Sequence, residues 1–151
     1  MKSPRFISVT PQFSKHRMQV YIAGQLKKFE ERVLERLKRV GENFVTHARS
    51  NPGYGDVTGN LKASIGYVIL KDGLQILQWF PGNTEVGRDN AKRFVNKIGK
   101  DHPHGFVIIG CAGMVYAAAV ESLGKNVITA SSLIAKEDLR KSMQALQNKF
   151  K

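Results

Sequence analysis

The chain of 151 residues suits one domain, and its 42% hydrophobic and 24% charged residues are typical of a folded protein. Because no apolar stretch reaches the roughly 18 residues of a membrane span and the first ten residues lack an apolar core, we expect neither a membrane helix nor a signal peptide. The single cysteine, Cys111, excludes an internal disulfide. It stands in an apolar run, which favours a packed thiol in a reducing compartment.

The net charge of +12 is unevenly distributed along the chain. Residues 1–50 carry 11 basic and 4 acidic side chains, a net +7, whereas residues 134–151 carry 5 and 2, a net +3. Such a balance favours anionic partners, either nucleic acid or an acidic protein surface. A solvated helix face is the alternative interpretation.

The first third of the chain predicts one long amphipathic helix. After a possible short strand at 6–9, the helix begins either at Thr10-Pro11 or at Ser14. Apolar residues then recur every three or four positions, at Ile22, Leu26, Phe29, Val33, Leu37, Val40, Phe44 and Ala48. Asn51-Pro52-Gly53 ends the helix.

The expected length of this helix has a consequence for assembly. About 35 residues make a rod on the order of 50 Å long, whereas a compact domain of this size is only about 35–40 Å across. Either the helix breaks, at Gly24 or Gly41, or part of its apolar stripe packs on another subunit.

The middle of the chain predicts a hairpin followed by a long loop. A glycine-rich turn over 53–59 leads through 60–65 to strands at 66–70 and 74–80, which Asp72-Gly73 joins. The stretch 81–105 is polar and rich in glycine and asparagine, so we expect a long mobile loop with room for a short helix at 90–98.

The last third predicts a further strand and a terminal helix. The apolar run 106–111 indicates a central strand, 114–123 a short helix or strand, and 126–130 an edge strand. Ser131 or Ser132 caps a last helix that continues to Phe150. The fold class is therefore a single α+β domain over 1–151. A long N-terminal helix packs on a small antiparallel sheet, with a short helix and a C-terminal helix.

The sequence contains no pattern typical of an enzyme, a nucleotide site or a cofactor. The glycines near Thr58 lack the lysine of a phosphate-binding loop, and no nucleophile stands in a recognisable catalytic motif. His102 and His104 have metal-ligand spacing, but the further ligands of a tetrahedral site are missing. An enzyme that uses this histidine pair remains an alternative, and it predicts metal in the purified protein.

Direct DNA binding is a second alternative. The basic side chains of the first helix could contact the phosphate backbone, and the candidates are Lys27, Lys28, Arg32, Arg36 and Arg39. This hypothesis predicts affinity that falls steeply with salt. Aromatic residues do not alternate with the basic ones, as they do on base-stacking surfaces.

Two short segments resemble a known family. Thr58-Gly-Asn-Leu-Lys-Ala-Ser-Ile65 is similar to the T-G-x-L-x-x-S-I signature of phage head–tail joining and tail-completion proteins. Tyr116-Ala-Ala-Ala-Val-Glu121 resembles the Y-A-x-x-V-E motif of the same family, and Gly124 corresponds to its following glycine. The order of helix, signature, hairpin, strand, second motif and last helix also agrees with the order in that family.

The resemblance implies a phage or prophage structural protein that assembles in the host cytoplasm and then occupies the virion neck. Its partners would be copies of itself in an oligomer such as a ring, together with portal, adaptor or tail-tube proteins and the passing DNA. Residues expected at a subunit interface are Leu26, Phe29, Val33, Leu37, Tyr116 and Glu121. The signature turn comprises Thr58, Gly59, Leu61 and Ser64, with Thr58 and Ser64 tying the turn before the first strand.

Overall fold

The computed structural model describes residues 14–50, 59–82, 85–114 and 117–149. The expected strand at 6–9, the helix start at Thr10-Pro11, and the residues Thr58, Tyr116 and Phe150 lie outside the described residues. The elements in chain order are α1 (Lys15–Ser50), α2 (Asn60–Ala63), β1 (Ile65–Lys71), β2 (Leu74–Trp79), α3 (Glu85–Asp101), β3 (Phe106–Ala112), α4 (Ala117–Ser122) and α5 (Thr129–Asn148). The predicted α+β class is confirmed.

The chain comprises two units, Met1–Arg32 and Val33–Lys151, where a single domain was expected. The division falls inside α1, which is a helix of 36 residues and runs unbroken through Gly24 and Gly41. Ser14 serves as its cap, since the N–H of Arg17 donates to Ser14 Oγ at 3.3 Å. The physical reason for the division is burial. The first buried residue of the helix is Val33.

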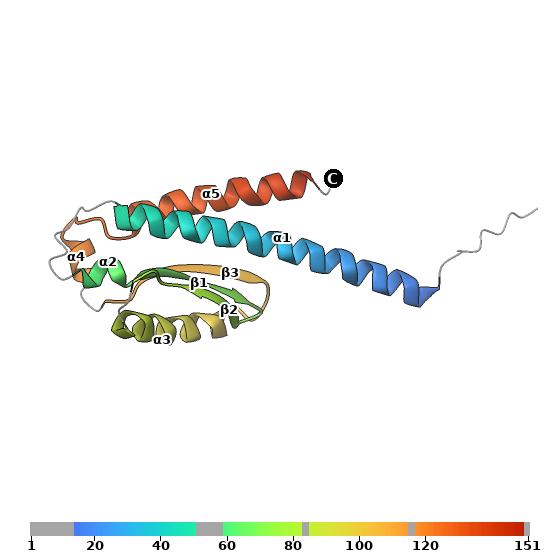
Figure 1. The fold of residues 1–151 in the computed structure, drawn as a ribbon, viewed down its shortest axis with the longest axis horizontal. Coiled ribbons are helices and arrows are strands. Elements are labelled where there is room, and N and C mark those ends of the chain that lie inside the picture. Colours follow the sequence, from blue (N-terminus) through green and yellow to red (C-terminus); the bar gives the residue numbers. More distant parts are fainter. Residues whose placement is uncertain (1–13, 51–58, 83–84, 115–116, 150–151) are drawn as a thin grey trace, which may run out of the picture. The chain divides into compact units, whose positions relative to one another are not determined.

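The second unit contains a sheet between helical layers. Figure 1 shows α3 on one face of the sheet, and the second half of α1 with α5 on the opposite side. The strand order is β2-β1-β3, with both pairs antiparallel. The hairpin turn is the predicted one, because Asp72 and Gly73 adopt φ of 51° and 77°, as a type I′ turn requires.

The central strand is β1, whereas the sequence predicted that 106–111 would be central. Six of the seven β1 residues are buried, and β3 lies at an edge of the sheet. The run in β3 is apolar because helices cover both of its faces. Ile108 packs in the core on the α1 side, while Ile109 and Cys111 pack in the core that includes Val95 of α3.

The stretch 81–105 is largely helical, which corrects the prediction of a long loop. Helix α3 occupies Glu85–Asp101. It packs on the sheet through Val95 and Ile98, against Val68 and Leu70 of β1. The polar composition was misleading, because a helix that covers one face of a sheet needs only a narrow apolar stripe.

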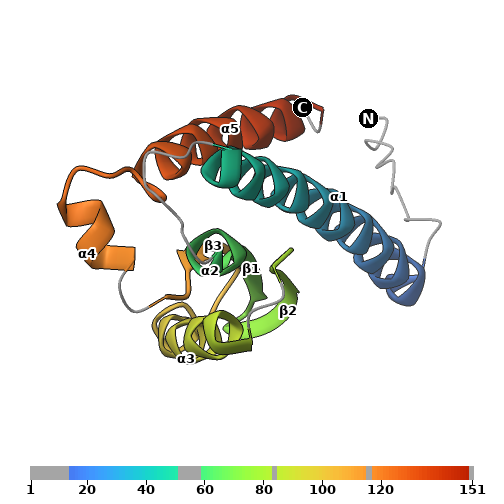
Figure 2. The ribbon, with the colours of Figure 1, turned by 60° about the vertical axis from the view of Figure 1, so that its left-hand side comes forward.

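Helix α5 lies antiparallel to the second half of α1, as Figure 2 shows. Two hydrogen bonds fix this arrangement: Arg36 Nη1 donates to Ser142 O at 3.0 Å, and His47 Nδ1 lies 2.9 Å from Ser131 Oγ. The expected edge strand at 126–130 does not form. These residues lead into α5, which begins at Thr129 and so precedes the predicted caps, Ser131 and Ser132.

Candidate subunit interface

The first half of α1 carries a row of apolar side chains that are exposed in the described structure. Met18, Ile22, Leu26 and Phe29 are 48%, 58%, 57% and 37% exposed. Spacings of four, four and three residues place them on one face of the helix, and we call this set the exposed stripe. Leu26 and Phe29 were predicted interface residues. Met18 was missed, although it precedes Ile22 by one helical turn.

Val33 and Leu37 continue the same stripe but have a different environment. They are 7% and 4% exposed and belong to the core cluster that includes Ile69 and Leu146. The prediction that they lie at a subunit interface is therefore wrong, because their own sheet and α5 already bury them. The periodicity is the same on both sides of Arg32. Only tertiary packing distinguishes the two halves.

Glu121 holds the start of α5 in place. Glu121 Oε2 accepts hydrogen bonds from the N–H groups of Val127 at 2.8 Å and Ile128 at 3.1 Å, and Oε1 accepts one from Thr129 at 3.2 Å. Ile128 is the N-cap of α5 and Thr129 its first residue, and their N–H groups have no intrahelical partner. The sequence placed Glu121 at a subunit interface, whereas its carboxylate is engaged within its own chain.

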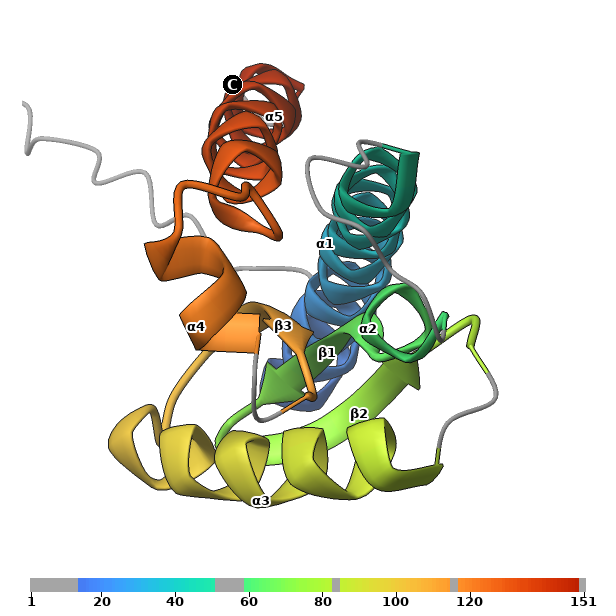
Figure 3. The same cartoon turned by 90° about the vertical axis from the view of Figure 1, so that its left-hand side faces the viewer.

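The pKa of Glu121 reports the same contacts. Burial opposes ionisation, but the hydrogen bonds from the Thr129 side chain and from the three backbone N–H groups prevail, and the pKa is lowered. The positive end of the helix dipole acts in the same direction. Glu121 is therefore a structural anion that orients α4 and α5, and Figure 3 shows the two helices joined by a short connection.

The described part of the signature turn also has a structural role. Gly59 adopts φ of 71° and Leu61 is buried. Ser64 Oγ donates to Leu61 O at 2.8 Å, and Ser64 O accepts from the N–H of Gly113 at 3.1 Å. The Ser64 side chain thus closes the end of α2, and its backbone carbonyl joins that end to the residue that follows β3.

The five basic residues proposed for DNA contact are not equivalent. The Arg36 guanidinium donates to α5, and Arg39 lies 3.9 Å from Glu35 in an exposed pair. Lys27, Lys28 and Arg32 are exposed on the first half of α1. The structure therefore leaves a smaller basic surface than the sequence suggested, since Arg36 already serves the packing of α5.

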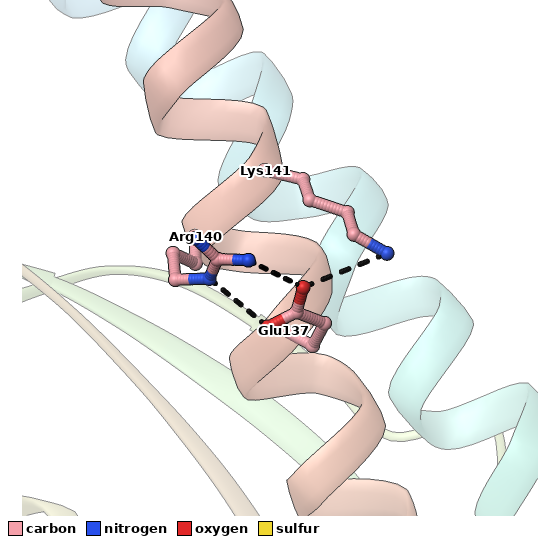
Figure 4. A network of polar contacts seen from close by, with 3 residues as sticks. All are labelled: Glu137, Arg140 and Lys141. Carbon is pink, nitrogen blue, oxygen red and sulfur yellow. Dashed lines mark hydrogen bonds and ion pairs between the residues drawn. The ribbon is translucent and has the colours of Figure 1, made fainter.

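Helix α5 carries a local charge network, shown in Figure 4. Glu137 accepts from Arg140 Nη2 at 2.7 Å and lies 3.6 Å from Lys141 Nζ. The hydrogen bond from Arg140 lowers the pKa of Glu137, and the same contact raises the pKa of Arg140. The pairs are exposed, so they contribute little to stability. The neighbouring Lys136 has no ion pair within the described ranges.

The described residues do not assemble a recognisable metal centre. No group of three or more histidine, cysteine, aspartate or glutamate residues is close enough to hold a metal in the described part of the chain. His102 and His104 are exposed between α3 and β3. Burial raises the pKa of Cys111 to about 12, which agrees with the predicted packed thiol.

No described helix is long and apolar enough to cross a membrane. No protein-family model, curated protein or solved structure matches the chain significantly. What bears on the function is the geometry of the chain itself and the motif resemblance at 58–65 and 116–121.

Proposed function

We propose that this protein is a phage or prophage structural protein, a head–tail connector or tail-completion protein that self-assembles at the virion neck. The observation that carries the proposal is the exposed stripe on α1. Isolated exposed apolar residues are ordinary on protein surfaces, but a contiguous row on one helix face is typical of an interaction site. Burying an exposed aliphatic side chain contributes about 1.5–3 kcal/mol, so several together favour association.

The roles of the motif residues support a non-catalytic protein. Ser64 connects α2 with β3, and Glu121 organises the start of α5. Both residues belong to segments that resemble the phage family, and both stabilise connections between elements. An assembly protein needs such connections because its surfaces must be presented rigidly to neighbouring subunits.

The proposed partners are further copies of the chain and the portal, adaptor or tail-tube proteins of the neck. The protein would assemble in the host cytoplasm and remain in the mature virion. Its net charge of +12 suits a position beside DNA, through long-range attraction to phosphates.

The decisive experiment is disruption of the gene in the phage or prophage that encodes it, followed by induction and electron microscopy. We expect DNA-filled heads and complete tails that remain separate, and we expect joined particles to return when the intact gene is supplied in trans. Joined, infectious particles without the protein would refute the function.

A further inference from the structure

A partly open apolar groove lies beside α5 in the second unit. It has a volume of about 220 Å³ and lies among α1, β3 and α5. We call it the α5 groove. The residues that line it and matter here are Val40 and Phe44 of α1, Ile108 of β3, and Ala135, Lys136 and Leu139 of α5.

The size and lining of the α5 groove define what it can accept. An apolar cavity of roughly 150 Å³ is large enough for benzene, so this groove has room for one or two aliphatic side chains. Its opening is accessible, because Ser132 and Lys136 are exposed. An aliphatic side chain whose neighbours carry no positive charge would therefore suit both the interior of the groove and the charge of Lys136 at its opening.

The exposed stripe has these properties. Ile22 and Leu26 are one helical turn apart, and each is more than half exposed. The residues that flank them on the helix surface include Gln19, Ala23 and Gln25, which carry no charge. A second copy can therefore approach this face without the repulsion expected between chains of net charge +12.

We infer that the exposed stripe of one copy docks in the α5 groove of a second copy. This inference rests on the proposed function, because a ring requires a contact between two different surfaces of the same chain. Pairing of two identical helix faces would close a dimer, whereas a groove that receives a different face propagates from subunit to subunit. Each copy then donates one stripe and offers one groove.

Disulfide trapping between two single-site variants tests this contact. Leu26→Cys is prepared with one affinity tag, Ala135→Cys with a tag of different mass, and the two are mixed and mildly oxidised. We expect at least about tenfold more heterodisulfide than in control mixtures, since a disulfide requires Cα atoms within about 7 Å. The controls are Lys28→Cys, on another face of α1, and Gln144→Cys, half a turn around α5.

The buried Cys111 is present in every sample, so the unmodified protein defines the background. Ser132→Cys is a second acceptor at the opening of the groove, and circular dichroism checks that each variant is folded. Predominant disulfides between two Leu26→Cys chains would overturn the inference in favour of helix pairing. A heterodisulfide yield no higher than that of the controls would also overturn it. Neither result bears on the phage experiment, which tests the function separately.

Discussion

At the scale of single residues, Glu121 shows how one carboxylate positions a helix. Its pKa is lower in the folded protein than in the unfolded chain, so its ionised form stabilises the fold. This contribution is complete above the unfolded pKa of about 4.3, and it is lost as the pH falls through the folded pKa. Asn126 adds to the same helix start, because its Oδ1 accepts from the N–H of Ala130 at 3.0 Å.

We predict that Glu121→Gln lowers the free energy of unfolding by about 1 kcal/mol at pH 7, the usual effect of losing a helix cap. The deficit relative to the unmodified protein should shrink as the pH falls through the folded pKa of Glu121. Urea denaturation at a series of pH values measures the deficit at pH 7 and its change with pH. Glu31→Gln, at an exposed position on α1, is the control and should have little effect. A deficit that is independent of pH would contradict the role of the charge.

Cys111 and Tyr67 show how burial changes the pKa of a titratable side chain. Burial raises the pKa of each to about 12, and for Tyr67 the nearby negative charge of Glu42 adds to the effect. Cys111 lies between the sheet and α3, where its Sγ contacts Gly66 O at 3.8 Å. A neutral thiol in this position behaves as a small apolar side chain, as its apolar sequence context predicted.

At the scale of elements, α1 contains two glycines that differ in the space available for a side chain. A Cβ at Gly41 would lie 2.5 Å from Cδ2 of the buried Tyr67 ring, whereas a Cβ at Gly24 would meet nothing within 4 Å. Gly41 therefore allows α1 to approach the sheet closely. At Gly24 no packing reason for glycine is visible in the described structure, and glycine only weakens the helix.

We predict that Gly41→Ala destabilises the protein by about 1–3 kcal/mol, the usual cost of overpacking a core. Gly24→Ala should leave the free energy of unfolding unchanged or raise it by up to about 1 kcal/mol through helix propensity. Thermal and urea denaturation followed by circular dichroism compare the two variants. Equal effects at both positions would show that contact with Tyr67 does not constrain α1.

Strand β2 is an unusual edge strand. It contains no charged residue, and Leu74 and Ile76 are 72% and 45% exposed. Edge strands are commonly protected by charges or prolines. The only irregularity in the pairing of β1 with β2 is a register shift between Ile69 and Leu70. This edge therefore exposes apolar side chains without the charges or prolines that usually protect an edge strand.

At the scale of the whole molecule, the exposed stripe and the second unit differ in how their apolar side chains are covered. The second unit buries its own core on both faces of the sheet. In the proposed assembly, the stripe on the first half of α1 is buried by a second copy of the chain. An assembly built in this way depends on protein concentration, because a separate chain supplies the missing apolar surface.

We predict that Ile22→Glu weakens self-association by at least about tenfold, which corresponds to 1.4 kcal/mol. Val20→Glu is the matched control, because Val20 is 59% exposed, nearly the same as the 58% of Ile22, but lies on the opposite face of α1. Sedimentation equilibrium over a range of concentrations measures the association constants of both variants. Equal weakening by the two substitutions would show that the exposed stripe is not part of the interface.

The sequence alone determined most of the local elements, because hydrophobic period and turn chemistry act over short distances. The spacing of α1, the Asp72-Gly73 turn and the apolar strands were all readable from nearby residues. Tertiary structure decided which elements cover each other. It made β1 central, ordered 85–101 into a helix with a narrow apolar stripe, and buried Val33 and Leu37 while leaving Ile22 and Leu26 exposed. Periodicity records that a helix face is apolar, but what covers that face depends on chain segments far away in the sequence or on another subunit.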